Sequence, residues 1–131
     1  VAAGFDGIVC LGDTADPFAP KVIRSSAGAL FRVPVIVERD VADGLAQVGE
    51  RGVIRYGTRM ADATPCDEAD LTGPVALVLG SEAHGLGQAH ADHIDSWLSV
   101  PMPGETESLN VAMAGTILAY EVARQRRSAG S

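Results

Sequence analysis

The chain has 131 residues, a formal net charge of −7 and 47% hydrophobic residues. These proportions are typical of a folded globular protein rather than a disordered one, and the length suits one domain with a buried core. No apolar run approaches the roughly 20 residues that a membrane-spanning helix needs, so we expect a cytoplasmic protein with no membrane partner. The negative charge argues against a surface that binds nucleic acid throughout, because phosphate contacts need clustered Lys and Arg. Any RNA contact must therefore be local.

The chain contains two cysteines, Cys10 and Cys66. Two cysteines this far apart in sequence are too few to predict a disulfide framework. Cys10 lies in an apolar run and is expected to be an inert core thiol. Asp67 and Glu68 follow Cys66, and because their charges oppose thiolate formation we predict that Cys66 is a poor nucleophile.

In chain order, the first half of the sequence alternates between apolar runs and segments with a helical repeat. Residues 21–30 can place apolar side chains on one helix face. Asp40 is a suitable N-cap for a second helix over 41–50, and Gly52 is a suitable stop for it. The apolar runs predict strands over residues 6–11, 33–37 and 53–56.

The second half begins with a polar, acidic segment over 58–72, which predicts a solvated loop with a short helix. Residues 75–79 form a continuous apolar run of the kind that is buried on both faces of a parallel sheet. A glycine-rich turn follows, with a short helix expected near 86–91. A last strand is predicted over 97–100, where prolines end it.

The last predicted helix covers residues 109–127, with Ser108 as its N-cap. Its first three turns are apolar or small almost all round, which is usual for a helix buried on more than one side. Small residues also permit close approach of another backbone, which suits a subunit interface. Strands that alternate with helices predict an α/β fold, with a mostly parallel sheet flanked by helices. No linker divides the chain, so we expect one domain over residues 1–131.

Two turns that follow predicted strands have sequences suited to ligand binding. The glycines of residues 78–87 let backbone groups approach a ligand at the carboxyl end of a strand, where open α/β sheets bind their ligands. The Pro/Gly loop over 100–111 leads directly into a capped helix. Ser108 and Asn110 lie where free amides and polar side chains converge, although an N-cap role alone would also account for Ser108.

A third segment carries the best local phosphate-binding patch of this acidic chain. Lys21 and Arg24 are three residues apart and therefore share a helix face, and Arg32 follows nearby. We predict that these three side chains contact RNA phosphates. A solvated helix face is the alternative explanation of the same spacing.

In combination, these segments resemble a known family. Residues 79–86 (LGSEAHGL) and 101–114 (PMPGETESLNVAMA) closely resemble the second and third motifs of the SpoU/TrmH family, within the SPOUT class of methyltransferases. Residues 20–31 (PKVIRSSAGALF) also resemble the region that this family has between its first and second motifs. The resemblance extends through nearly the whole chain, and its Ser-Leu-Asn-Val element is highly specific.

The resemblance implies a parallel sheet with a C-terminal trefoil knot, a bent S-adenosylmethionine held by the knot loops, and a homodimer formed through the last helix. Glu82 would brace the loops, and Ser108 and Asn110 would border the reacting centre as catalytic residues. The positions that the resemblance assigns to cofactor binding are Leu79, Gly80, Glu82, Val100, Met102, Leu109 and Asn110.

The function implied by the resemblance is transfer of a methyl group to a ribose 2′-hydroxyl of RNA. The bacterial branch that modifies 23S ribosomal RNA is the most similar, so rRNA is favoured over tRNA as the partner. Three alternatives stay open: a tRNA 2′-O-methyltransferase, transfer to a base nitrogen, and a non-catalytic remnant that binds cofactor or RNA.

The sequence departs from the family at its beginning. The first motif, Asn-x-Gly-x-x-x-Arg, is not found in the chain, and in this family its arginine is thought to take part in catalysis. We therefore expect an N-terminally incomplete domain that lacks the first strand and most of the first helix and is inactive on its own.

A metal-dependent hydrolase is the remaining alternative. His90 and His93 are three residues apart, with Asp92 and Asp95 beside them, and two helical ligands at such a spacing can share a metal ion. A third ligand and a His-Glu-x-x-His pattern are lacking. We therefore expect no metal.

Overall fold

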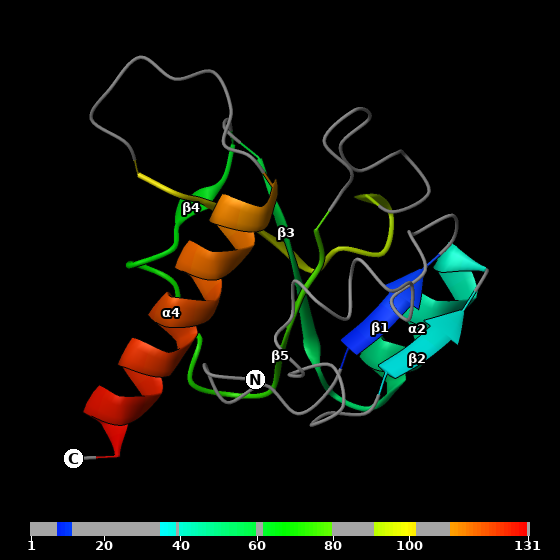
Figure 1. The fold of residues 1–131 in the computed structure, drawn as a ribbon, viewed down its shortest axis with the longest axis horizontal. Coiled ribbons are helices and arrows are strands. Elements are labelled where there is room, and N and C mark those ends of the chain that lie inside the picture. Colours follow the sequence, from blue (N-terminus) through cyan, green and yellow to red (C-terminus); the bar gives the residue numbers. More distant parts are fainter. Residues whose placement is uncertain are drawn as a thin grey trace, which may run out of the picture.

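The computed structural model confirms an α/β fold built from parallel strands. It describes residues 8–11, 35–38, 40–59, 62–79, 91–101 and 111–130. The elements, in chain order, are β1 (Ile8–Leu11), β2 (Val35–Glu38), α2 (Val41–Glu50), β3 (Ile54–Thr58), β4 (Thr64–Pro65), β5 (Val75–Leu77), β6 (Ser96–Ser99) and α4 (Val111–Ala129) (Figure 1). The helices predicted over 21–30 and near 86–91 fall on residues outside these ranges, apart from Ala91.

Every strand pair among the described residues is parallel. β1 pairs with β2, and the other four strands form a sheet in the order β4-β6-β3-β5. Figure 1 shows α4 along one side of the four-stranded sheet, whereas α2, β1 and β2 lie on the opposite side of the molecule. The strand predictions were correct to within about two residues, as expected for apolar runs of this length.

Both ends of α2 follow from their capping residues, as predicted. The Asp40 carboxylate accepts a hydrogen bond from the backbone N–H of Asp43 at 3.0 Å, which satisfies one free donor of the first turn. Gly52, one residue beyond the C-cap, has a φ of +77°, a conformation that glycine adopts without strain. The helix buries Gly44 and Leu45.

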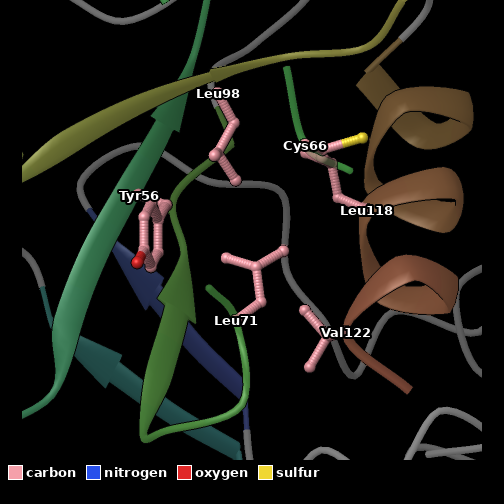
Figure 2. Close-up of a cluster of buried hydrophobic side chains, with 6 residues drawn as sticks. All are labelled: Tyr56, Cys66, Leu71, Leu98, Leu118 and Val122. Carbon is pink, nitrogen blue, oxygen red and sulfur yellow. The ribbon is translucent and has the colours of Figure 1, made fainter. Parts of the chain in front are cut away.

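The main apolar core lies between the four-stranded sheet and α4. Its most deeply buried members, Leu71, Leu98, Leu118 and Val122, have no exposed surface. They come from a loop, from β6 and from α4, so the core joins segments far apart in sequence. Figure 2 shows the complete cluster: Tyr56, Cys66, Leu71, Leu98, Leu118 and Val122.

The prediction of a solvated loop with a short helix over 58–72 was wrong in two respects. Thr58 belongs to β3, and the described part of the segment forms β4 and turns rather than a helix. Cys66 is 5% exposed and Leu71 is completely buried, although the acidic residues around them are exposed. The sequence pattern did not predict β4, because β4 is defined by its pairing with β6. The two residues of β4 do not encode that contact.

The last helix, α4, is buried along one face within this chain. Ala114, Leu118 and Val122 face the core, whereas Met113 and Tyr120 are 57% and 61% exposed. The prediction of burial on more than one side is therefore not met by this chain alone. Its predicted N-cap, Ser108, falls outside the described residues. No described helix is long and apolar enough to cross a membrane.

Candidate functional site

The carboxyl edge of the parallel sheet brings described residues of the two predicted ligand-binding segments, Leu79 and Val100, to the same side of the molecule. β3 lies between β5 and β6, and all three strands run in the same direction. β5 leads into Leu79, β6 leads into Val100, and β3 leads into Arg59. Ligands of open α/β sheets bind outside the carboxyl ends of the strands, so this edge is the candidate site.

Leu79 connects this edge to α4. A Cβ atom at Gly115 would lie 2.7 Å from the Leu79 Cδ1, so the Leu79 side chain packs directly on the helix backbone where glycine leaves room. Leu79 nevertheless keeps 41% of its surface exposed. A large apolar side chain is therefore available to a ligand at the end of β5.

Val100, the second described residue with a predicted cofactor role, is half-buried and packs against the main core. It is thus held in place by the same cluster that fixes α4. The remaining residues with predicted roles lie outside the described part of the chain, and their roles stay predictions: Gly80, Glu82, Met102, Ser108, Leu109, Asn110, Lys21, Arg24 and Arg32.

Sequence reasoning missed an arginine at this edge. The Arg59 guanidinium lies over the Trp97 ring, 4.4 Å from its centroid. Its Nε and Nη2 donate hydrogen bonds of 3.1 and 2.7 Å to the backbone carbonyl of Asp62, which has a φ of +52°. Its backbone N–H donates to the carbonyl of Leu98. The signal in the sequence was a basic residue three positions after the strand predicted over 53–56.

A charged clamp fixes the opposite end of β3. Arg55 donates from Nε and Nη2 to the two carboxylate oxygens of Asp95, both at 2.9 Å, and from Nη1 to the carbonyl of Leu45 in α2. The backbone N–H of Arg55 also donates to Asp95. The hydrogen bond from Arg55 lowers the pKa of Asp95, and the same bond raises the pKa of Arg55.

This clamp bears on the metal alternative. The Asp95 carboxylate is committed to Arg55, so it is a poor candidate for a cation ligand. Among the residues that the structure describes, no group of three or more His, Cys, Asp or Glu side chains is placed to hold a metal ion. His90 falls outside those residues.

A polar network on α4 holds the loop that precedes β5. The Gln125 side chain accepts a hydrogen bond from the Leu71 N–H at 2.8 Å and donates to the Cys66 carbonyl at 3.3 Å. Gln125 also donates to Glu121, which accepts two hydrogen bonds from Arg124. The Arg124 hydrogen bonds are the main cause of the lowered pKa of Glu121, which is 9% exposed.

The environment of Cys66 confirms the prediction that it is a poor nucleophile, but the main cause differs from the predicted one. Burial contributes most to raising the pKa of the Cys66 thiol, and the charges of Glu121 and Asp67 add to it. Glu121 is 55 positions away in sequence, so only the fold brings its charge to the thiol.

The sequence matches a known protein family over most of its length. Residues 1–120 match the model of the SpoU rRNA Methylase family. The chain belongs to this family. A 23S rRNA (guanosine-2′-O-)-methyltransferase RlmB of Xanthomonas axonopodis pv. citri is 38% identical over 128 residues, which are 98% of this chain and 51% of the relative. The 23S rRNA (guanosine(2553)-2′-O)-methyltransferase RlmP of Bacillus subtilis is 38% identical over 121 residues, covering 92% of this chain and 48% of the relative.

The fold also matches a solved structure of a SpoU methyltransferase. The SpoU methyltransferase AviRb of Streptomyces viridochromogenes, solved in complex with the cofactor AdoMet, matches with a TM-score of 0.89 and 34% identity, over 97% of this chain and 52% of that chain. This likeness agrees with the parallel α/β architecture. The predicted trefoil knot involves residues outside the described ranges and stays a prediction. The chain spans about half the length of the curated relatives it matches.

Proposed function

We propose that the protein containing this chain transfers a methyl group from S-adenosylmethionine to a ribose 2′-hydroxyl of 23S ribosomal RNA. The observation that carries the proposal is that β5 and β6, the strands that precede the two family motifs, end at the same edge of the parallel sheet, shortly before Leu79 and Val100. Two relatives named as 23S rRNA 2′-O-methyltransferases and a neighbour solved with AdoMet support it.

The residues present at the edge fit this cofactor. Leu79 offers an exposed apolar surface at the end of β5, and Gly115 leaves space beside it on α4. We assign cofactor binding to this surface and to the family positions around it, with Glu82 as the residue that braces the loops. The backbone and side-chain positions concerned are Leu79, Gly80, Glu82, Val100, Met102, Leu109 and Asn110.

When bound, the cofactor supplies an electrophilic methyl group on a sulfonium, so the difficult chemistry belongs to it. The protein must align the ribose oxygen for in-line attack and help to remove its proton. In this proposal, Ser108 and Asn110 hydrogen-bond to the 2′-hydroxyl or its neighbouring phosphate. Lys21, Arg24 and Arg32 bind RNA phosphates.

The same proposal covers where the protein acts, which RNA it prefers and how it assembles. The protein acts in the cytoplasm, prefers rRNA to tRNA, and forms a homodimer through α4. The exposed Met113 and Tyr120 support the dimer, because large apolar side chains on a helix face are often covered by a partner. Sedimentation equilibrium of Tyr120→Glu against the unaltered protein tests the interface, and dimers of unchanged affinity would contradict it.

The first experiment is a calorimetric titration of S-adenosylmethionine, and then S-adenosylhomocysteine, into the protein. Saturable binding near one site per chain is expected. Methyl transfer to unmodified 23S rRNA and to tRNA is then compared, and 2′-O-methylnucleosides are identified in the digested product. Transfer only to tRNA, or only to a base, would replace the proposed acceptor, and binding without transfer would favour a non-catalytic module.

Variants test the catalytic assignments. Ser108→Ala and Asn110→Ala should each lower kcat about a hundredfold, because loss of the hydrogen bonds that align the 2′-hydroxyl costs about this much. Ser128→Ala, exposed near the end of α4, is the matched control and should leave kcat unchanged. Thermal unfolding checks that stability is preserved, and unchanged turnover in both variants would remove Ser108 and Asn110 from the site.

A further inference from the structure

The Arg59–Trp97 pair is the most distinctive feature of the candidate edge that the assigned roles leave unused. β3 lies between β5 and β6, so Arg59, directly after β3, lies between the two strand ends that lead into the family motifs. Trp97 is in β6, in register with Gly57 of β3, a residue with no side chain to compete for the same face. The pair is therefore built into the centre of the edge.

The Arg59 guanidinium is held rather than merely exposed. Trp97 supports one face of it, and the Asp62 carbonyl accepts from both Nε and Nη2. Such support reduces the entropy that the side chain loses when it binds a ligand. The Nη1 group takes no part in these hydrogen bonds, so it can donate to an anion.

Among the residues that the structure describes, Arg59 has no ion pair with a carboxylate. The ion pairs among the described residues join Arg55 to Asp95 and Arg124 to Glu121, and neither involves Arg59. The chain as a whole has a net charge of −7, so a cation that is held in place at the candidate edge is an attractive site for an anion. Arginine donors in this arrangement are suited to a phosphate.

We propose that Arg59, supported by Trp97, binds a backbone phosphate of the RNA substrate next to the reacting ribose. This inference rests on the proposed function and adds a binding residue to it. It also addresses how an acidic chain contacts RNA, since it adds one fixed cation at the candidate edge to the phosphate contacts proposed for Lys21, Arg24 and Arg32.

The test compares two variants that remove the same charge from opposite ends of β3. Arg59→Gln removes it at the carboxyl edge. Arg51→Gln removes it at the exposed C-cap of α2, two residues before Val53 and close to the amino end of β3. Affinity for unmodified 23S rRNA is measured by filter binding over a series of KCl concentrations, and S-adenosylmethionine affinity is measured by calorimetry.

Arg59→Gln should weaken RNA binding about fivefold to tenfold, as expected for loss of one charged hydrogen bond near the surface, and should reduce the salt slope by about 0.7 to 1. Arg51→Gln should weaken it less than about twofold. Arg59→Lys, which keeps the charge but not the planar contact with Trp97, should fall between Arg59→Gln and the unaltered protein.

Equal losses in Arg59→Gln and Arg51→Gln would overturn the inference while leaving the proposed function intact. Loss of S-adenosylmethionine affinity with RNA affinity preserved would also overturn it, because Arg59 would then serve the cofactor. If the unaltered protein bound neither RNA nor S-adenosylmethionine, the proposed function would fail together with it.

Discussion

The two faces of the four-stranded sheet are held by different forces. The face toward α4 is closed by apolar burial, with Leu98 and Leu118 completely inaccessible. The face toward α2 is held by the Arg55–Asp95 clamp, whose side chains are 16% and 39% exposed. Apolar burial is not weakened by charge screening, whereas a partly exposed ion pair is weakened by both protonation and screening. The two faces should therefore respond differently to the same perturbation.

The largest effect is expected on the apolar face. Leu98→Ala should lower the free energy of unfolding by about 3 kcal/mol, because it removes buried methyl groups and leaves a cavity against α4. Urea unfolding monitored by circular dichroism measures the change. Ile54→Ala, on the 41% exposed Ile54 of β3, is the control and should cost less than about 1 kcal/mol. Similar costs at the two positions would show that the core is not where the structure has it.

A substitution on the face toward α2 should lower the free energy of unfolding by less. Asp95→Ala removes three hydrogen bonds to Arg55 and should cost about 1 to 2 kcal/mol at low salt, since charge-assisted bonds are strong but this pair is partly hydrated. Because screening already weakens the pair in the parent, the cost should shrink in high salt, whereas the cost of Leu98→Ala should not. Glu68→Ala is the exposed acidic control. A cost for Asp95→Ala that salt leaves unchanged would contradict the electrostatic account of this face.

Acid should act on each face through a carboxylate whose pKa is lowered in the folded protein. The pKa values of Asp95 and Glu121 are lowered in the folded protein, mainly by hydrogen bonds from Arg55 and Arg124 respectively. Each carboxylate therefore stabilises the fold above its unfolded-state pKa, and that contribution is lost as pH falls through the folded-state value. The pH dependence of urea unfolding below about pH 5 should flatten in Asp95→Asn and in Glu121→Gln. Parallel curves for parent and variants would refute both assignments.

The smallest effect on stability is expected where the apolar face meets the candidate site. Gly115→Ala adds a Cβ that would lie 2.7 Å from Leu79 Cδ1, so Leu79 must move. Alanine also favours the helix by about 1 kcal/mol over glycine, so the net change in unfolding free energy should stay within about 1 kcal/mol. S-adenosylmethionine affinity, measured by calorimetry, should fall severalfold. The double variant Gly115→Ala, Leu79→Ala separates the displacement of Leu79 from any change in the helix, and an unaltered affinity in Gly115→Ala would remove Leu79 from the cofactor surface.

The sequence by itself determined the elements whose signals are local. Asp40 and Gly52 define the ends of α2 because capping depends on a few neighbouring residues. A continuous apolar run located β5, and short, mostly apolar segments located β3 and β6. The motif residues also predicted the family correctly, because a Ser-Leu-Asn-Val element after a strand and a loop is a specific pattern.

Only the tertiary structure decided which distant residues meet. Cys66 and Leu71 belong to an acidic segment whose composition predicts a solvated loop, yet the fold places both side chains in the core. Pairing of β4 with β6 and the hydrogen bonds with Gln125 hold that segment against α4. It likewise placed Arg59 on Trp97, at the centre of the candidate edge. Strand order and register arise from long-range packing, and a local reading of composition or periodicity does not contain them.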